Sequence, residues 1–127
     1  MRSLDNLFRV LIIGDPGYTD DETFNILLSV PFGDDDIDLK PDDVLYIIGY
    51  DQHLDILTEQ FCKKNKIKYL YAPEMLENES QIQDVLNSVD QIIGCWNGES
   101  NVIEKLMIEN GEKNRKRLNI FKFNPNR

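Results

Sequence analysis

Five apolar runs, each about the length of a strand, recur along the chain. They lie near residues 9–14, 44–49, 67–72, 91–96 and 118–123. Continuous apolar runs bounded by turn-forming residues are typical of strands that are buried on both faces of a parallel sheet. The run at 67–72 instead alternates polar and apolar residues, which predicts a strand near a sheet edge with one side facing water.

Between these runs the apolar residues recur at helical spacing. Thr19 with Glu22, and Ser80 with Gln83, have the spacing of a capping box, in which one side chain caps the helix and the other reaches back to the cap backbone. These two pairs predict where the first and third helices begin.

The other two helices are recognised by their apolar faces and their ends. Leu54, Leu57 and Phe61 lie on one face of a helix that is expected to end near Lys66. The last helix is expected over residues 101–110, before a glycine that stops it.

Strands and helices therefore alternate from the first run to the last. Parallel strands need crossover connections, and such crossovers are right-handed. The pattern predicts an α/β fold: one Rossmann-like domain over residues 1–127, with a doubly wound five-stranded parallel sheet flanked by helices.

The charge of the chain excludes one class of partner. The 127 residues include 14 Lys+Arg and 23 Asp+Glu, which gives a formal net charge of −9. Nucleic acids are held by positively charged surfaces, so no nucleic-acid partner is expected. A small phosphorylated ligand needs only one local pocket and is compatible with this charge.

Cysteine usage and the amino-terminal segment predict a cytoplasmic protein. Cys62 and Cys95 are too few for a disulfide framework and are predicted to be small core residues in a reducing compartment. Residues 1–17 hold no long apolar segment, so neither a signal peptide nor a membrane span is expected. The aspartate-rich segment 31–43 lacks the glycine and glutamate of an EF-hand loop, so we expect a solvated loop and no metal site.

The segment 91–104 is the first candidate for a binding site. A strand ending at Trp96 is followed by a turn and then by a helix that begins near Asn101. The first N–H groups of a helix are unpaired and lie at the positive end of its dipole, so those of Ser100 and Asn101 could hold a phosphate. Most strand–turn–helix joints bind nothing, so this segment alone does not establish a ligand.

Three predicted loops bring further candidates to the same edge of the sheet. Ligands of open parallel sheets bind at the carboxyl ends of the strands. The candidate ligand-binding residues in these loops are Gly14, Asp15 and Tyr18, then Gly49 and Asp55, then Trp96, Asn97, Gly98, Ser100 and Asn101.

The first loop resembles that of the SLOG superfamily, a Rossmann-like group that includes the LOG-type nucleotide phosphoribohydrolases and the YspA-like proteins. The sequence GDPGYTDDE is similar to the family's G-S-R-x-[YF]-x-D-x-E, with matches at Gly14, Tyr18, Asp20 and Glu22. The resemblance covers residues 9–123 in element order and loop spacing. It implies a sheet with strand one at the centre and strands three and five at the edges.

The other two loops match the family at fewer positions. GYDQHLD lies over G-G-A-x-G-A-D, with matches at Gly49 and Asp55. WNGESNVIE aligns with P-G-G-x-G-T-x-x-E, with matches at Gly98 and Glu104. The YspA-like branch has a run of an aromatic residue, a polar residue and a glycine at this place. The tripeptide WNG resembles that run more than it resembles the LOG pattern.

The chain departs from LOG enzymes where catalysis depends on charge. Those enzymes use an arginine at the start of the preceding helix, and this position is Gln81 here. A neutral glutamine cannot stabilise charge on a ribose phosphate as a guanidinium does. Asp15 and Pro16 replace the family's Ser-Arg, and Asp15 would repel a phosphate unless it contacts ribose hydroxyls or an amine.

Four residues each allow two interpretations. By resemblance Glu104 is the catalytic carboxylate, but with Asn101 it also has the spacing of a capping box. Asp55 is either an acid of a first helical turn or a partner of ribose hydroxyls. Trp96 either belongs to the core or stacks on a base, and His53 is either a surface residue or a general base.

The function expected from these residues is binding of a nucleotide or a nucleotide-derived small molecule, ADP-ribose-like or NAD-like, in the crevice between the loops. Gly14 and Gly49 would floor the crevice, while Tyr18 or Trp96 would stack on a base. Two alternatives stay open: a LOG-type N-glycosidase or phosphoribohydrolase that uses Glu104, and an interaction protein that has lost the ligand. We expect no resident cofactor and no membrane partner.

SLOG relatives commonly form dimers, so the resemblance is compatible with a homodimer.

Overall fold

The computed structural model of the chain describes residues 7–15, 17–18, 20–33, 38–99, 104–105, 108 and 117–123. Its strands are β1 (Phe8–Gly14), β2 (Val44–Ile48), β3 (Lys68–Tyr71), β4 (Gln91–Trp96) and β5 (Arg117–Lys122). Its α-helices are α1 (Asp21–Leu28), α2 (Gln52–Asn65) and α3 (Glu79–Ser88).

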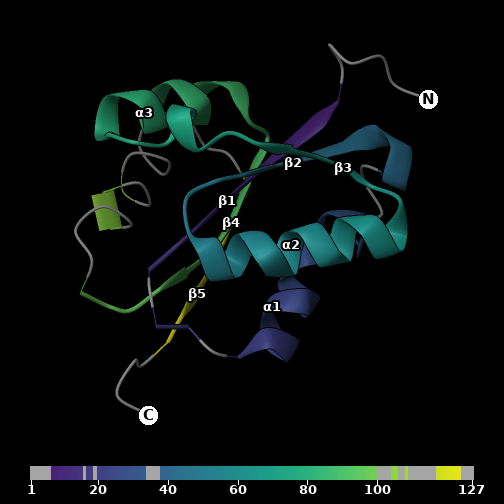
Figure 1. Ribbon diagram of the computed structural model, residues 1–127, viewed down its shortest axis with the longest axis horizontal. Helices are drawn as coiled ribbons and strands as arrows, with labels where there is room; N and C mark the ends of the chain where they lie inside the picture. Colours follow the sequence, from purple (N-terminus) through teal and green to yellow (C-terminus); the bar gives the residue numbers. More distant parts are fainter. Residues whose placement is uncertain are drawn as a thin grey trace.

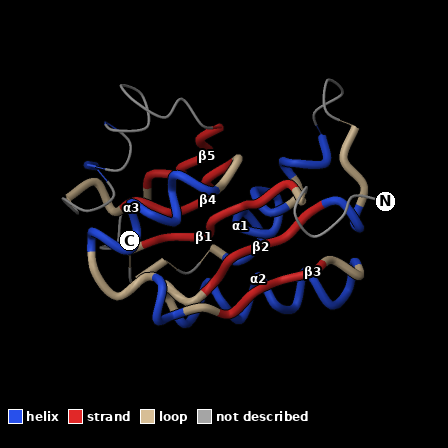
Figure 2. Tube along the Cα trace, turned by 90° about the horizontal axis from the view of Figure 1, so that it is seen from above, coloured by secondary structure: helices blue, strands red, loops and turns tan. Residues whose placement is uncertain are grey.

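The strands form one five-stranded sheet in the order β3-β2-β1-β4-β5, and every neighbouring pair is parallel (Figure 2). This confirms the predicted sheet, with β1 at its centre and β3 and β5 at its edges. The predicted strand bounds differ from the observed ones by one residue at most. β3 is an edge strand as its alternation predicted, and Leu70 and Tyr71 are exposed on it.

The helices cover both faces of the sheet (Figure 1). α1 and α2 lie on one face, where Phe24 and Leu54 pack against β1 and β2 side chains such as Ile12 and Tyr46. α3 lies on the other face and packs its apolar stripe against Leu11, Ile13, Ile47 and Ile92. Alternate residues of each central strand thus point to opposite faces, which is why these strands are apolar at most positions.

Both cysteines are fully buried and form no disulfide, in agreement with their predicted core role. Within the described part of the chain, every helix is too short or too polar to cross a bilayer.

Two predicted helix caps are wrong by one or two residues. α1 is capped by Asp20, whose Oδ1 accepts the Thr23 N–H at 3.1 Å, and not by Thr19 with Glu22. α3 is capped by Asn78, whose Oδ1 accepts the Gln81 N–H at 2.9 Å, and not by Ser80. Carboxylate and amide oxygens are strong acceptors at the positive end of a helix, so these neighbours take the capping position.

The other helix ends agree with the sequence pattern. α2 ends at Asn65, and Lys66 takes a left-handed conformation (φ 58°), as is common after a helix C-terminus. α1 ends at Leu28 and is followed by the 3₁₀ turn Val30–Gly33. The fourth predicted helix lies mostly outside the described residues, although the backbone is helical at Glu104, Lys105 and Ile108.

Candidate functional site

The sheet order creates a switch point between β1 and β4. From β1 the chain crosses through α1 to β2 on one side, and later returns through α3 to β4 on the other side. Ligands of open parallel sheets bind where such loops leave the strands, so the expected crevice would lie outside the carboxyl ends of β1 and β4. The first of these loops begins with Asp15 and the second with Asn97, so two groups of predicted residues do meet.

A hydrogen bond joins the two loops directly. Asp15 Oδ2 accepts the Asn97 N–H at 2.8 Å, and the Asp15 N–H donates to the Cys95 carbonyl at 2.9 Å. The Asp15 side chain is only 5% exposed. The sequence pointed to Asp15 as a ligand contact, whereas in the fold this carboxylate already accepts the N–H of Asn97, another predicted ligand contact. A phosphate in the same place would meet a fixed negative charge.

The loop after β4 is shaped by its own side chains. Asn97 Oδ1 accepts the Glu99 N–H at 2.8 Å, which closes a tight turn. Gly98 at the centre of this turn has φ +86°, a left-handed conformation that favours glycine. Ser100 and Asn101 lie outside the described residues, so the role predicted for their N–H groups stays a prediction.

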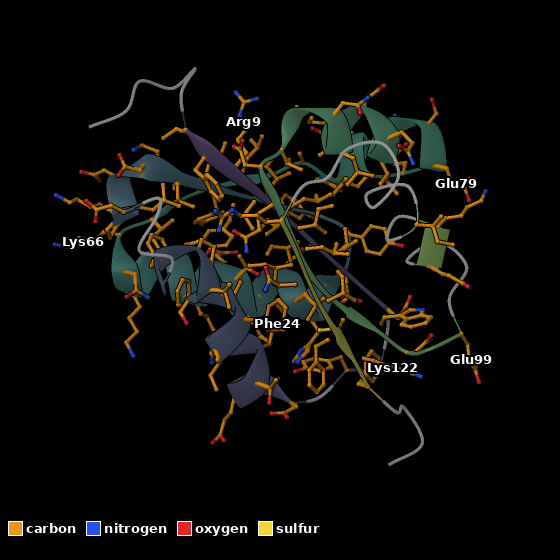
Figure 3. The ribbon with its side chains drawn as sticks, turned by 180° about the vertical axis from the view of Figure 1, so that it is seen from behind. Arg9, Phe24, Lys66, Glu79, Glu99 and Lys122 are labelled. Atoms are coloured by element: carbon orange, nitrogen blue, oxygen red, sulfur yellow. The ribbon has the colours of Figure 1, made fainter. Side chains whose placement is uncertain are left out.

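A lysine that the sequence analysis did not select lies beside this loop. Lys122, the last residue of β5, pairs in register with Trp96, and its Nζ lies 5.5 Å from the centre of the indole ring. A Cβ placed on Gly98 would lie 2.8 Å from Lys122 Cε, so the lysine stem fills the space over this glycine. Figure 3 shows Lys122 and Glu99 at one end of the sheet and Arg9 at the other.

Negative and positive side chains lie at different places along the carboxyl edge of the sheet. Asp15 and Asp51 both raise the pKa of Tyr50, although burial of the hydroxyl is the larger cause. Burial and, to a lesser degree, the same two carboxylates raise the pKa of the Cys95 thiol to about 12, so this thiol stays protonated at neutral pH. The Asp15 and Asp51 carboxylates therefore make the inner part of this edge negative, and Lys122 contributes a positive charge beside Trp96.

Tyr18 is a core residue and not an exposed stacking surface. Its ring makes edge contacts with Phe24, Phe121 and Phe123 at centroid distances of 6.1, 6.1 and 5.2 Å, and its side chain is 4% exposed. Burial raises the pKa of its hydroxyl. The Tyr18 ring therefore has no exposed face on which a base could stack, so Trp96 is the remaining candidate of the two predicted stacking residues.

Gly14 and Gly49 were expected to line the bottom of the crevice. In the structure, neighbouring protein atoms leave no room for a side chain at either position. A Cβ on Gly14 would lie 2.3 Å from Leu54 Cδ1 of α2. Gly49 has φ +131°, and a Cβ there would lie 2.6 Å from the Pro73 backbone nitrogen. Neither glycine needs a ligand to explain it.

Asp55 lies on the β2–β3 side of the edge, away from the switch point. It belongs to the first turn of α2, as one of its two interpretations held, and its Oδ1 accepts the Gly49 N–H at 2.8 Å. α2 itself is capped by Asp51, which accepts the Leu54 N–H at 3.1 Å. Burial raises the pKa of Asp55, and the negative charges of Asp51 and Glu59 add to this, while the Gly49 N–H opposes it.

The residues weighed for a catalytic role make contacts that do not need a substrate to explain them. Gln81, at the family's arginine position, uses its side-chain oxygen to accept the Glu77 N–H at 3.1 Å. Glu104 is exposed on a helical turn, and its predicted capping partner Asn101 lies outside the described residues. His53 Nε2 lies 2.8 Å from Asp21 Oδ1, where both side chains are about half exposed, which agrees with a surface role.

Metal chemistry finds no support at this edge. Among the residues that the structure describes, no group of three His, Cys, Asp or Glu side chains could hold a metal ion.

No protein-family model, no curated protein and no solved structure matches this chain.

Proposed function

We propose that the chain binds a nucleotide-derived small molecule at the carboxyl edge of its sheet, with Trp96 and Lys122 as the contacting side chains. The observation that supports this most is the position of the Lys122 ammonium, 5.5 Å from the Trp96 ring and next to the switch point. An aromatic face beside a cation is complementary to a planar base that carries a phosphate.

The anionic group of this ligand is expected near Lys122 and not at the centre of the crevice. The N–H groups of Asn97 and Glu99 already donate to side chains of the protein, and the Asp15 carboxylate repels a phosphate. The base would stack on the indole in place of the ammonium, which would then turn to the phosphate. An exposed cation–π contact is worth only about 0.5–1 kcal/mol, so this exchange costs little.

The experiment that tests this function is a thermal-shift screen with AMP, ADP-ribose, NAD and cyclic dinucleotides, followed by calorimetric titration of any hit. A ligand that binds only the folded state stabilises it by about 2.7 kcal/mol at a concentration of one hundred times Kd. We expect Lys122→Gln to weaken binding more than tenfold, since it removes the cation and keeps most of the stem.

Lys68→Gln is the matched control. Lys68 is exposed at the amino end of β3, so it lies away from the carboxyl ends of the strands, where the site is proposed. It should leave the affinity unchanged. Equal losses for the two variants would mean that overall charge, and not this site, governs binding. If no ligand of the screen shifts the melting temperature, the interaction protein becomes the better interpretation. Gly98 is unsuitable for such a test, since its φ of +86° makes any substitution there strained.

Hydrolysis of the N-glycosidic bond of AMP is expected to be negligible. Gln81 is neutral and its oxygen is engaged by the Glu77 N–H, so it supplies no charge to the transition state. The measurement is release of adenine by chromatography, with Glu104→Gln as the control. Turnover on the order of one per second or faster, abolished in Glu104→Gln, would support the phosphoribohydrolase instead.

A further inference from the structure

A hollow lies at the carboxyl edge of the sheet, on its β2–β3 side. It has a volume of about 410 Å³ and is lined by residues that follow β2, end β3 or belong to the first two turns of α2: Gly49, Gln52, Asp55, Ile56, Glu59 and Tyr71. None of these residues belongs to the site proposed at Trp96 and Lys122, so the hollow is a separate feature.

Asp55 brings a carboxylate to this hollow. The residue is 9% exposed. Its Oδ1 accepts the Gly49 N–H at 2.8 Å, and among the described residues no donor reaches its Oδ2. A buried carboxylate is costly unless both of its oxygens are paired. Asp55 Oδ1 is engaged by the Gly49 N–H, and Oδ2 can still accept a hydrogen bond from a ligand in the hollow.

The walls of the hollow combine apolar surface with a second negative charge. Ile56 is 47% exposed and Tyr71 is 62% exposed, which is high for large apolar side chains. Glu59 lies one helical turn beyond Asp55 and pairs with Lys63 at 2.7 Å. The α2 N-terminus contributes roughly half a positive charge, which the Asp51 cap and Asp55 outweigh.

We propose that this hollow binds a primary alkylammonium group. The ammonium would donate to Asp55 Oδ2, and its alkyl stem would lie along Ile56 and the ring of Tyr71. An anion is disfavoured by the two carboxylates, and a metal ion would need more ligands than the described residues offer here. A primary alkylammonium can donate a hydrogen bond to Asp55 Oδ2, is attracted by the negative charge and has an alkyl stem that contacts the apolar walls. The Tyr71 ring adds a cation–π contribution.

The test is an NMR titration of the full chain with n-butylammonium chloride, with 1-butanol as the neutral probe of similar shape. We expect saturable shifts of the Gly49, Asp55 and Ile56 amides with the ammonium and much weaker ones with the alcohol. Asp55→Asn should reduce the affinity at least tenfold, because the amide can still accept the Gly49 N–H but has lost the charge. No saturable shift in the wild type, or equal binding of the alcohol, would overturn the proposal.

Asp42→Asn is the matched control, since Asp42 is exposed just before β2, at the opposite edge of the sheet. It makes the same chemical change and should leave the affinity within twofold of wild type. An equal loss in both variants would assign binding to the overall negative charge and refute the site. Tyr71→Ser changes an exposed ring without risk to the core and should weaken binding at least threefold. Lys122→Gln should not affect n-butylammonium binding, so the outcome is independent of the nucleotide proposal.

Discussion

Replacing Gly94 with alanine is expected to destabilise the protein by about 3 kcal/mol, the upper part of the usual range for an overpacked core. Gly94 pairs in register with Ile13 in the two innermost strands of the sheet. A Cβ at Gly94 would lie 2.3 Å from the Ile13 carbonyl oxygen, a backbone atom that cannot rotate away. The strands would have to separate, and the measurement is the free energy of unfolding in urea.

Gly33→Ala is the control for this prediction. A Cβ at Gly33 meets no atom within 4 Å, and its φ is not in the left-handed region. Because alanine restricts the unfolded chain more than glycine does, this variant should be neutral or stabilised by up to about 1 kcal/mol. Similar stabilities for Gly94→Ala and Gly33→Ala would mean that β1 and β4 are not paired as described.

Replacing Asp15 with alanine is expected to cost about 2 kcal/mol and to loosen the loop after β4. The change removes the acceptor of the part-buried Asn97 N–H, and a buried donor that loses its acceptor costs about 1–3 kcal/mol. The measurements are urea unfolding and hydrogen exchange of the Asn97 amide, which should become faster relative to the Cys95 amide of the adjacent strand.

Asp15→Asn distinguishes the contribution of the hydrogen-bond acceptor from that of the negative charge. Its amide oxygen can still accept the Asn97 N–H, so we expect it to recover most of the lost stability. It also removes a negative charge from the crevice and should tighten binding of any phosphorylated ligand. If Asp15→Asn is as unstable as Asp15→Ala, the carboxylate charge holds the two loops together and the hydrogen bond alone does not.

The fold follows from local sequence patterns for a clear physical reason. Strands buried on both faces are apolar at most positions, so β1, β2 and β4 are visible as nearly continuous apolar runs in the sequence. The helices between them require parallel strands and right-handed crossovers, which leave few arrangements. Helix starts were less predictable, because Asp20 and Asn78 competed with adjacent residues of similar capping ability.

The sequence by itself determined the strands, most of the helix bounds, the parallel sheet and the edge at which candidate residues gather. Only the tertiary structure decided what those residues contact. Asp15 and Asn97 are 82 positions apart and Trp96 meets Lys122 through strand register, so neither pair has a local signature. Tyr18 is buried against Phe24 of α1, Phe121 of β5 and Phe123, which sequence spacing could not reveal. Periodicity reports which face of an element is buried, whereas a site depends on distances between elements that are remote in the chain.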